Sequence, residues 1–365
     1  MRRPSCSSNA TARGRPLNRA DFDAVVVGAG PAGTAAAIVG ARGGSRVAIV
    51  ERRAFPRDRP GETLHPGVEG ILRSLGAWGA VEAEGFLRHE GISVRQDGTA
   101  RFEAYGADGA EPWLGLQAWR TDFDGILLER AKRAGVAVLQ PCRAIAPLRD
   151  GGRVVGVRTT CGDLGARLLI DAAGGGHWLA RALGMGIEYR SPPLIARYGY
   201  ATGGLDELRR GPVFEAERDG WSWLAQVKPR LLHWTRLALG GVPTPRTPPD
   251  VVARFPPRGG ARGADVTWRS LTRPAGPGFL VIGDAAAVTD PASSHGVLRA
   301  LLTGVLAGEC MCAEGSDERA VARLEDATRS FFDADVSALR RLYAGGLLEP
   351  PRWIDGPGRR VSTNV

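Results

Sequence analysis

The stretch FDAVVVGAGPAGTAAAIVGARGGSRVAIVE, residues 22–51, decides the fold of this chain. Two short apolar runs, at 24–27 and 47–50, have the composition of strands that are buried on both faces. Between them stand a G-x-G-x-x-G turn at 28–33 and an alanine-rich helical segment, and Glu51 ends the second run. Strand, glycine turn, helix, strand and acid within about thirty residues predict a βαβ unit that binds a dinucleotide.

Each glycine of this turn has its own structural role. Gly28 allows the tight turn, Gly30 lets the backbone approach a pyrophosphate, and Gly33 lets helix and strand pack closely. The helix that begins at this turn directs its free N–H groups and its positive dipole end toward phosphates. Glu51 stands where a carboxylate accepts from both hydroxyls of a ribose, which favours FAD or NAD over NADP. The alternative is that the three glycines form only a turn.

Length and composition are those of a globular protein with two lobes. The chain has 365 residues, of which 43% are hydrophobic and 24% are charged. No apolar run approaches the length that spans a bilayer, so stable membrane insertion is not expected. Residues 1–20 contain five arginines and no apolar core, which predicts a disordered basic tail and not a secretory signal.

The charge and the cysteines argue against several classes of function. The net charge is +9, but the arginines are scattered along the sequence, so nucleic acid is not a predicted partner. The five cysteines are dispersed, which excludes a disulfide framework and favours the reducing cytoplasm. Cys310-x-Cys312 lacks the second ligand pair of a zinc site, so no metal is predicted.

A second motif lies some 250 residues after the first, by the spacing expected of a discontinuous nucleotide fold. An apolar strand ends in Gly283-Asp284, and the sequence DPASSHG follows at 290–296 before a long helical pattern. A carboxylate at the carboxyl end of such a strand lies where nucleotides bind. Asp284 is therefore a candidate for a ribityl hydroxyl, with a capped helix after a strand as the alternative.

Five motifs in this order resemble FAD-dependent monooxygenases and flavin-dependent halogenases. They are GAGPAG with Glu51, GETLHPG (61–67), WRTDFD (119–124), DAAGGG (171–176) and GDAAAVTDPASSHG (283–296). The resemblance covers about residues 21–315 and is nearest to the tryptophan-halogenase-like branch. It implies the p-hydroxybenzoate-hydroxylase-like fold, an α/β architecture with a Rossmann-like FAD-binding domain of the GR2 type, an inserted β-sheet substrate domain and C-terminal helices.

The domain boundaries follow from these motifs and from the composition between them. Helical periodicity fades and tryptophans concentrate after residue 186, while 240–265 is dense in Pro and Gly and is predicted to be loop. The predicted segments are 21–75, 115–185 and 275–315 for the FAD-binding domain, 76–114 and 186–274 for the substrate lobe, and 316–365 for C-terminal helices and a tail.

The resemblance also implies which residues hold FAD. Arg120 would contact the cofactor from its helix, while Glu62 and Thr63 would lie beside the isoalloxazine. The implied contacts of the ADP half are Gly28, Gly30, Pro31, Ala32, Gly33, Glu51 and Arg52, and those of the flavin half include Gly283, Asp284, Pro291, His295 and Gly296.

Two departures from the halogenase pattern favour hydroxylation. Halogenases use a lysine near the substrate, whereas the two lysines of this chain, Lys132 and Lys228, are expected on a helix surface and in a turn. The Trp-x-Trp-x-Ile-Pro stretch of halogenases is here Trp221-Ser-Trp223-Leu-Ala-Gln. We therefore expect hydroxylation of an aromatic substrate through a flavin C4a-hydroperoxide, and halogenation is the alternative.

Catalytic and substrate-binding residues are proposed from their positions beside these motifs. His65 and His295 stand next to predicted flavin contacts and suit proton transfer near neutral pH, and Glu62 joins them as a catalytic candidate. The alternative is that each histidine is satisfied by backbone carbonyls. Candidates for the substrate cavity are Trp223, His233 and Trp234, whose alternative is a place in the sheet core.

The sequence contains no second nucleotide fingerprint, which favours reduction of the flavin by a separate NAD(P)H-dependent reductase. The predicted function is a cytoplasmic FAD-dependent monooxygenase acting on an indole- or phenol-like ring, either free or bound to a peptide or carrier. The alternatives are a flavin-dependent halogenase, an FAD-dependent reductase or dehydrogenase of the prenyl-reductase type, and a flavoprotein-like remnant that binds a partner.

Overall fold

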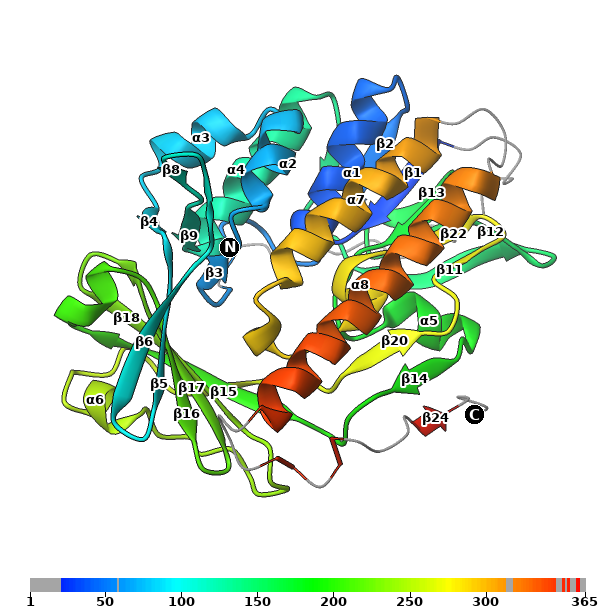
Figure 1. The fold of residues 1–365 in the computed structure, drawn as a ribbon. Coiled ribbons are helices and arrows are strands. Elements are labelled where there is room, and N and C mark those ends of the chain that lie inside the picture. Colours follow the sequence, from blue (N-terminus) through cyan, green and yellow to red (C-terminus); the bar gives the residue numbers. More distant parts are fainter. Residues whose placement is uncertain are drawn as a thin grey trace, which may run out of the picture.

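The computed structural model describes residues 21–57, 59–312, 318–345, 350–351, 353–354 and 359–361. Two lobes lie side by side, a nucleotide-binding lobe with a mixed sheet and a second lobe built on a separate sheet (Figure 1). The basic tail predicted at 1–20 lies outside the described residues. Among those residues, no helix combines the length and the apolar character that a membrane crossing requires.

An eight-stranded sheet forms the centre of the nucleotide-binding lobe. The predicted βαβ unit is confirmed, because β1 (Phe22–Val27) and β2 (Val47–Val50) pair in parallel and flank α1 (Pro31–Arg42). β1 also pairs in parallel with β13 (Gly162–Asp171), and β13 pairs with β22 (Phe279–Val281). The carboxyl ends of four strands from distant segments therefore meet at one edge of the sheet. The remaining strands are β10 (Ala137–Leu139), β11 (Ala144–Asp150), β12 (Arg153–Thr159) and β21 (Ala275–Gly276).

Close helix packing covers one face of this sheet. α7 (Gly296–Cys312) lies against α1, as Figure 1 shows, and two glycines of α7 allow the approach. A Cβ atom on Gly304 would lie 2.4 Å from the Ala32 carbonyl oxygen, and one on Gly308 would lie 2.4 Å from Val39 Cβ. The other helices of this lobe are α2 (Val68–Ser74), α3 (Trp78–Ala83), α4 (Arg120–Arg133) and α5 (Trp178–Leu183).

The second lobe is a seven-stranded sheet in the order β19-β15-β18-β17-β16-β5-β6. Residues 91–104 form a hairpin, whose turn residues Asp97 and Gly98 have φ of 49° and 79°. One face of the sheet is turned toward the nucleotide-binding lobe. The strands are β5 (Gly91–Gln96), β6 (Thr99–Ala104), β15 (Ile195–Thr202), β16 (Val213–Glu217), β17 (Gly220–Lys228), β18 (Leu231–Ala238) and β19 (Arg262–Asp265).

Smaller sheets and short elements join the two lobes. β3 (Glu62–Leu64), β9 (Gly115–Ala118) and β4 (Leu87–His89) form one sheet, in that order. The other elements are β7 (Ala107–Asp108), β8 (Glu111–Pro112), β14 (Ile187–Tyr189), β20 (Arg269–Leu271), β23 (Ala287–Val288) and β24 (Arg359–Val361), with short 3-10 helices at Asp206–Arg209, Gly283–Ala285 and Pro291–Ser293.

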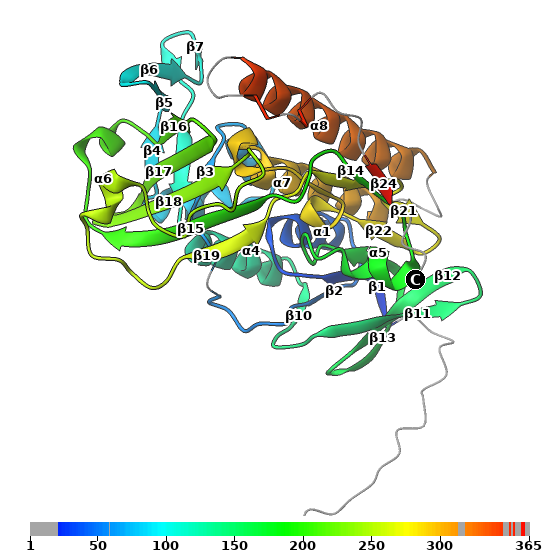
Figure 2. The ribbon, with the colours of Figure 1, turned by 90° about the horizontal axis from the view of Figure 1, so that it is seen from below.

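The last long helix, α8 (Glu318–Ala344), is a single element that runs along α7 and reaches the second lobe (Figure 2). Its residues Phe332, Val336, Leu339 and Tyr343 share a hydrophobic cluster with tryptophans of β17. Its contacts therefore join the two lobes.

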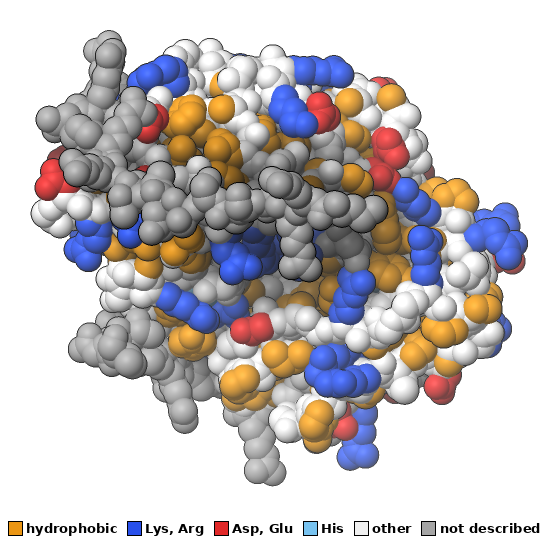
Figure 3. Space-filling model, turned by 180° about the vertical axis from the view of Figure 1, so that it is seen from behind, with side chains coloured by type: hydrophobic (Ala, Val, Ile, Leu, Met, Phe, Trp, Pro, Cys, Tyr) orange, Lys and Arg blue, Asp and Glu red, His pale blue; other side chains and the backbone are white. Residues whose placement is uncertain are grey.

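One local expectation is wrong. The Pro- and Gly-rich segment 240–265 is not all loop, because it contains α6 (Asp250–Ala253) and the edge strand β19. α4 begins at Arg120, and the Thr121 hydroxyl donates to the Arg57 carbonyl oxygen at 3.1 Å. Charged side chains are dispersed over the face in Figure 3, as the scattered arginines of the sequence lead one to expect.

Candidate functional site

A cavity of about 810 Å³ lies between the carboxyl edge of the central sheet and the second lobe. Gly28, Gly30 and Glu51 line it at the glycine turn, and Asp284 and Gly296 line it near the start of α7. The two motifs that the sequence separates by most of the chain therefore face one space. This arrangement is the one that a shared, elongated cofactor requires.

Glycine is required at two positions of the turn beside this cavity. Gly28 has φ of 107°, and a Cβ atom there would lie 2.4 Å from the Ala172 carbonyl oxygen. A Cβ atom on Gly33 would lie 2.0 Å from the Gly28 carbonyl oxygen. Pro31 opens α1 immediately behind the turn, with the helix N-terminus at the cavity. Backbone N–H groups are thus held where a pyrophosphate can approach them.

Glu51 is fixed at the end of β2 by its hydrogen bonds. One carboxylate oxygen accepts from the Ala29 N–H at 3.0 Å, and the other accepts from the Arg53 N–H at 3.0 Å. The side chain is buried and lines the cavity together with Arg52. Each carboxylate oxygen has a further lone pair, so this geometry leaves capacity for a ribose hydroxyl. The glycine cradle and this acid fit the adenosine end of FAD.

A buried network of charges forms the next part of the wall. Asp124 is completely buried, and it accepts from Arg57 at 3.0 Å and from Arg120 at 2.6 Å. Arg120 also donates to Glu62 at 2.5 Å, and both residues line the cavity. The sequence analysis singled out neither Asp124 nor Arg57 as a site residue. The i,i+4 spacing of Arg120 and Asp124 was the available signal.

Glu62 lies between this network and Asp284. Burial raises the pKa of Glu62, and the carboxylates of Asp284 and Asp124 raise it further, while Arg120 opposes the change. The side chain lines the cavity, as does the neighbouring Thr63. Glu62 therefore keeps its proton to higher pH than an ordinary carboxyl group, which suits a proton donor.

The segment before α7 is anchored by a buried acid. Asp290 accepts from the Trp268 indole at 2.9 Å and from the Tyr343 hydroxyl at 2.8 Å. Tyr343 in turn accepts from the indole of Trp221 at 2.9 Å. Burial raises the pKa of Asp290 to about 6. The loop that carries Pro291 is thus tied to α8 and to β17, although nothing in its sequence indicates either partner.

His65 and His295 lie together, 5.4 Å apart between ring centroids and edge to face. His295 Nδ1 hydrogen-bonds Asp335 of α8 at 2.8 Å, and Arg299 donates to the same carboxylate at 2.7 Å. Burial lowers the pKa of His65, and the nearby His295 lowers it further. The neighbouring residues Ser294 and Gly296 line the cavity, whereas the two imidazoles are not part of the lining.

The face of the second sheet that meets the cavity is aromatic. Trp221, Trp223, Tyr198 and His233 line it, and burial lowers the pKa of His233 to about 4, so this histidine is neutral. Trp234 does not line the cavity, contrary to the expectation that it joins its neighbour. Adjacent residues of a strand point to opposite faces, and Trp234 packs on the far side with Leu224 and Leu232.

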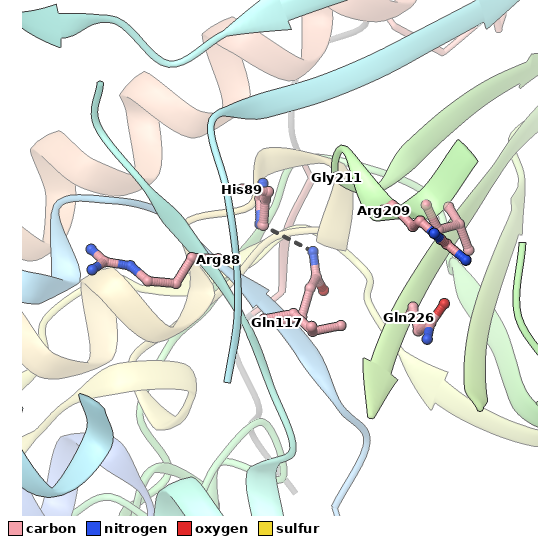
Figure 4. A pocket seen from close by; sticks show the side chains of 8 residues that line it. Arg88, His89, Gln117, Arg209, Gly211 and Gln226 are labelled. Carbon is pink, nitrogen blue, oxygen red and sulfur yellow. Dashed lines mark hydrogen bonds between the residues drawn. The ribbon is translucent and has the colours of Figure 1, made fainter. Parts of the chain in front are cut away.

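A hydrogen-bonded chain links this aromatic face to a second, smaller cavity of about 150 Å³ (Figure 4). The Trp223 indole donates to the Thr63 hydroxyl at 3.2 Å, and Thr63 donates to the Gln117 side-chain oxygen at 2.9 Å. The amide nitrogen of Gln117 lies 3.1 Å from His89 Nε2. The chain fixes Thr63 and Trp223, and sequence reasoning singled out neither Gln117 nor His89.

Neither lysine lines the large cavity. Lys132 pairs with Glu129 on α4 at 2.6 Å, and both side chains are exposed. Lys228 ends β17, bonds Asp122 at 2.5 Å and lies 5.7 Å from the Trp119 ring centroid. These positions match the surface and turn locations expected from the sequence.

Comparisons with known proteins agree with this geometry. Residues 21–198 match the family model described as FAD binding domain. The menaquinone reductase of Mycobacterium tuberculosis is 29% identical over 367 residues, which cover 92% of this chain and 86% of that protein.

Solved structures share the fold. The myxobacterial chondrochloren halogenase CndH superposes with a TM-score of 0.74 and 25% identity, over 87% of this chain and 82% of that one. PqsL, an FAD-dependent monooxygenase of Pseudomonas aeruginosa, gives a TM-score of 0.74 at 19% identity, over 87% and 94% of the two chains.

Proposed function

Because residues 21–198 match the family model described as FAD binding domain and the chain shares the fold of flavin-dependent halogenases and monooxygenases, we propose that this FAD-dependent oxidoreductase hydroxylates an aromatic ring. The proposal rests on one cavity whose lining differs between its two ends. One end presents the glycine turn and Glu51, and the other presents Trp223, Tyr198 and the neutral His233. A ring stacked on these aromatic side chains would lie beside the flavin end of the cofactor.

In this proposal the chain's own residues bind and orient both ligands. FAD supplies the redox chemistry. Gly28, Gly30 and Glu51 hold its ADP half, and Arg120 and Asp284 contact its flavin half. The tryptophan-rich face of the second lobe limits the access of bulk water to this space, which protects an oxygenation from hydrolytic side reactions.

Proton transfer in this proposal uses groups around the flavin end. Glu62 donates from the cavity wall, where its pKa is raised. His295 is held by Asp335 and exchanges a proton with His65 behind the loop at 291–296. A matched test replaces Glu62 by Gln and, as a control, the exposed Glu84 by Gln. The pH profile of turnover should lose its decrease at high pH only in the first variant, because a proton donor fails once it is ionised, and two identical profiles would refute the role of Glu62.

Halogenation is the less favoured function, because among the residues that line the described cavity there is no lysine. Replacing Lys228 by Met should leave the turnover rate within about twofold of the native value, because the ion pair that Lys228 forms at the surface contributes little free energy. A halogenase that relays its oxidant through a lysine would lose its product entirely.

A reductase remains the second candidate, favoured by the menaquinone reductase that aligns with 92% of this chain. The two functions differ in their need for oxygen. A reductase turns over without oxygen once the flavin is reduced, whereas hydroxylation stops. We further propose that a separate NAD(P)H-dependent reductase supplies the electrons, which predicts that NADPH alone bleaches the bound flavin slowly.

The decisive experiment supplies the protein with FAD, a flavin reductase and ¹⁸O₂, and presents indoles, phenols and ring-bearing peptides in parallel. Mass spectrometry should find one ¹⁸O atom in the product. A halide adduct without label would establish the halogenase, and an anaerobic gain of two hydrogens by a quinone or alkene would establish the reductase.

A further inference from the structure

Two cysteines meet beside the adenosine end of the cavity, and the proposed reaction uses neither of them. Cys142 follows β10, is buried, and lines the cavity. Cys161 is exposed in the two-residue turn between β12 and β13. Both are free thiols.

The antiparallel pairing of β11 and β12 brings these thiols together. Ala144 pairs with Thr159, and the Thr160 N–H donates to the Arg143 carbonyl oxygen at 2.9 Å, so residues 142 and 161 come next across the ladder. The Cys161 sulfur lies 3.8 Å from the carbonyl oxygen of Pro141, the residue before Cys142. Such cross-strand neighbours have the Cα separation of bridged cysteines.

The surroundings also favour the reactive form of one thiol. Burial opposes ionisation of Cys142, but its hydrogen bonds with Cys161, Thr159 and Thr160 outweigh it and lower the pKa of the Cys142 thiol, whose sulfur lies 3.3 Å from the Thr159 hydroxyl oxygen. A thiolate next to a second thiol is the arrangement in which oxidation ends in a disulfide.

Cys142 is coupled directly to the residue assigned to the ribose. Its backbone N–H donates to the Glu51 carbonyl oxygen at 2.7 Å. A disulfide that turns the Cys142 side chain toward Cys161 therefore acts, through this hydrogen bond, on the end of β2, where the Glu51 carboxylate is held.

We propose that Cys142 and Cys161 form a reversible disulfide under hydrogen peroxide and that this bond weakens the hold on FAD. One thiolate attacks a peroxide oxygen, the O–O bond breaks, and hydroxide leaves and takes up a proton as water. The second thiol then displaces the hydroxyl from the oxidised sulfur, which forms the S–S bond and releases a second water. Two thiols lose two electrons and two protons, and peroxide is reduced. An FAD-dependent oxidoreductase that meets oxygen is itself a source of this oxidant.

The test measures the disulfide and cofactor binding separately. The full-length protein is treated with peroxide and mapped by mass spectrometry after thiol alkylation, and its Kd for FAD is measured before oxidation, after oxidation and after addition of dithiothreitol. We expect a 142–161 cross-link, a rise in Kd of about three- to tenfold, and reversal by dithiothreitol.

Two serine variants provide the controls. Cys161→Ser should form no cross-link and keep its FAD affinity under peroxide, while Cys312→Ser should respond like the native chain, because Cys312 lies on α7 away from this pair. Absence of the cross-link in the native protein would overturn the proposal. A cross-link that leaves the Kd for FAD unchanged would overturn its link to the cofactor.

Discussion

Arg57 and Asp124 form an ion pair with 3.0 Å between their charged atoms, and both side chains are almost completely removed from solvent. The two residues come from the loop after β2 and from α4, so the pair ties the cofactor loop to the helix that carries Arg120. The same Asp124 carboxylate compensates Arg120. The pair holds this part of the cavity wall in place, and the stability of the wall therefore depends on the Asp124 carboxylate.

Asp124→Asn should therefore destabilise the chain strongly. The substitution removes the carboxylate that Arg57 and Arg120 share and leaves Arg57 with Glu51 and Arg120 with Glu62 as their remaining partners. Breaking a buried pair in this way costs about 3 kcal/mol. Urea unfolding followed by tryptophan fluorescence measures the loss. Asp163→Asn is the matched control, because its partner Arg158 is exposed and no measurable change is expected. Equal effects in the two variants would contradict the role of Asp124.

Glu51→Arg should abolish FAD retention. The substitution replaces the carboxylate proposed to bind the ribose by a cation. That cation would stand next to Arg57, whose guanidinium lies 3.5 Å from the Glu51 carboxylate in the native chain. We expect the Kd for FAD, measured by flavin fluorescence quenching, to rise at least a hundredfold. Glu84→Arg, at an exposed position after α3, makes the same charge change and should bind FAD normally. Unchanged retention in Glu51→Arg would refute the ribose contact.

Asp290 gives the stability of the fold a defined pH dependence. Its pKa is raised from 3.8 to about 6, so between about pH 4 and about pH 6 the unfolded chain releases a proton that the folded chain keeps. Stability from this group therefore falls as the pH rises through that window, by about 3 kcal/mol in full. Asp290→Asn removes the dependence. The unfolding free energies of the native chain and of the variant are measured from pH 4 to pH 7. As the pH rises, the variant should gain stability relative to the native chain. A difference that stays constant would show that Asp290 is ionised throughout.

Gly33→Ala should damage both folding and FAD binding. Its Cβ atom would stand 2.0 Å from the Gly28 carbonyl oxygen, so strand and helix must separate at the pyrophosphate turn. We expect a loss of about 2–3 kcal/mol, as for other overpacked sites, and weaker FAD binding. Gly70→Ala in α2 is the control, since a Cβ there meets nothing within 4 Å and should stabilise the helix by about 0.5–1 kcal/mol. Thermal unfolding with and without FAD separates the two variants.

Much of the nucleotide-binding lobe follows from local pattern. Residues 22–51 contain both strands, the turn and the acid within one short segment, so their arrangement needs no distant partner. The hairpin at Asp97-Gly98 is equally local, because two residues with positive φ set its turn. The resemblance to flavoproteins, and not a local pattern, implied the place of Arg120, which lines the cavity in the structure.

Other parts depend on docking that no short segment contains. Asp335 meets His295 only because α8 packs along α7, and Asp290 meets Tyr343 for the same reason. His233 and Trp234 show a different limit. Because side chains alternate along a strand, His233 and Trp234 cannot lie on the same face of the sheet. Which of these two residues points into the cavity depends on the pairing of β17 with β18.

The order of the two cofactor contacts along the chain has a consequence for biosynthesis. The glycine turn leaves the ribosome early, whereas Asp284 and the start of α7 emerge much later. At about 5–20 residues per second, the roughly 250 residues between them take on the order of 10–50 s to synthesise. During that interval a nascent chain can touch the coenzyme at one end only, so its loading is completed near the end of translation or after release.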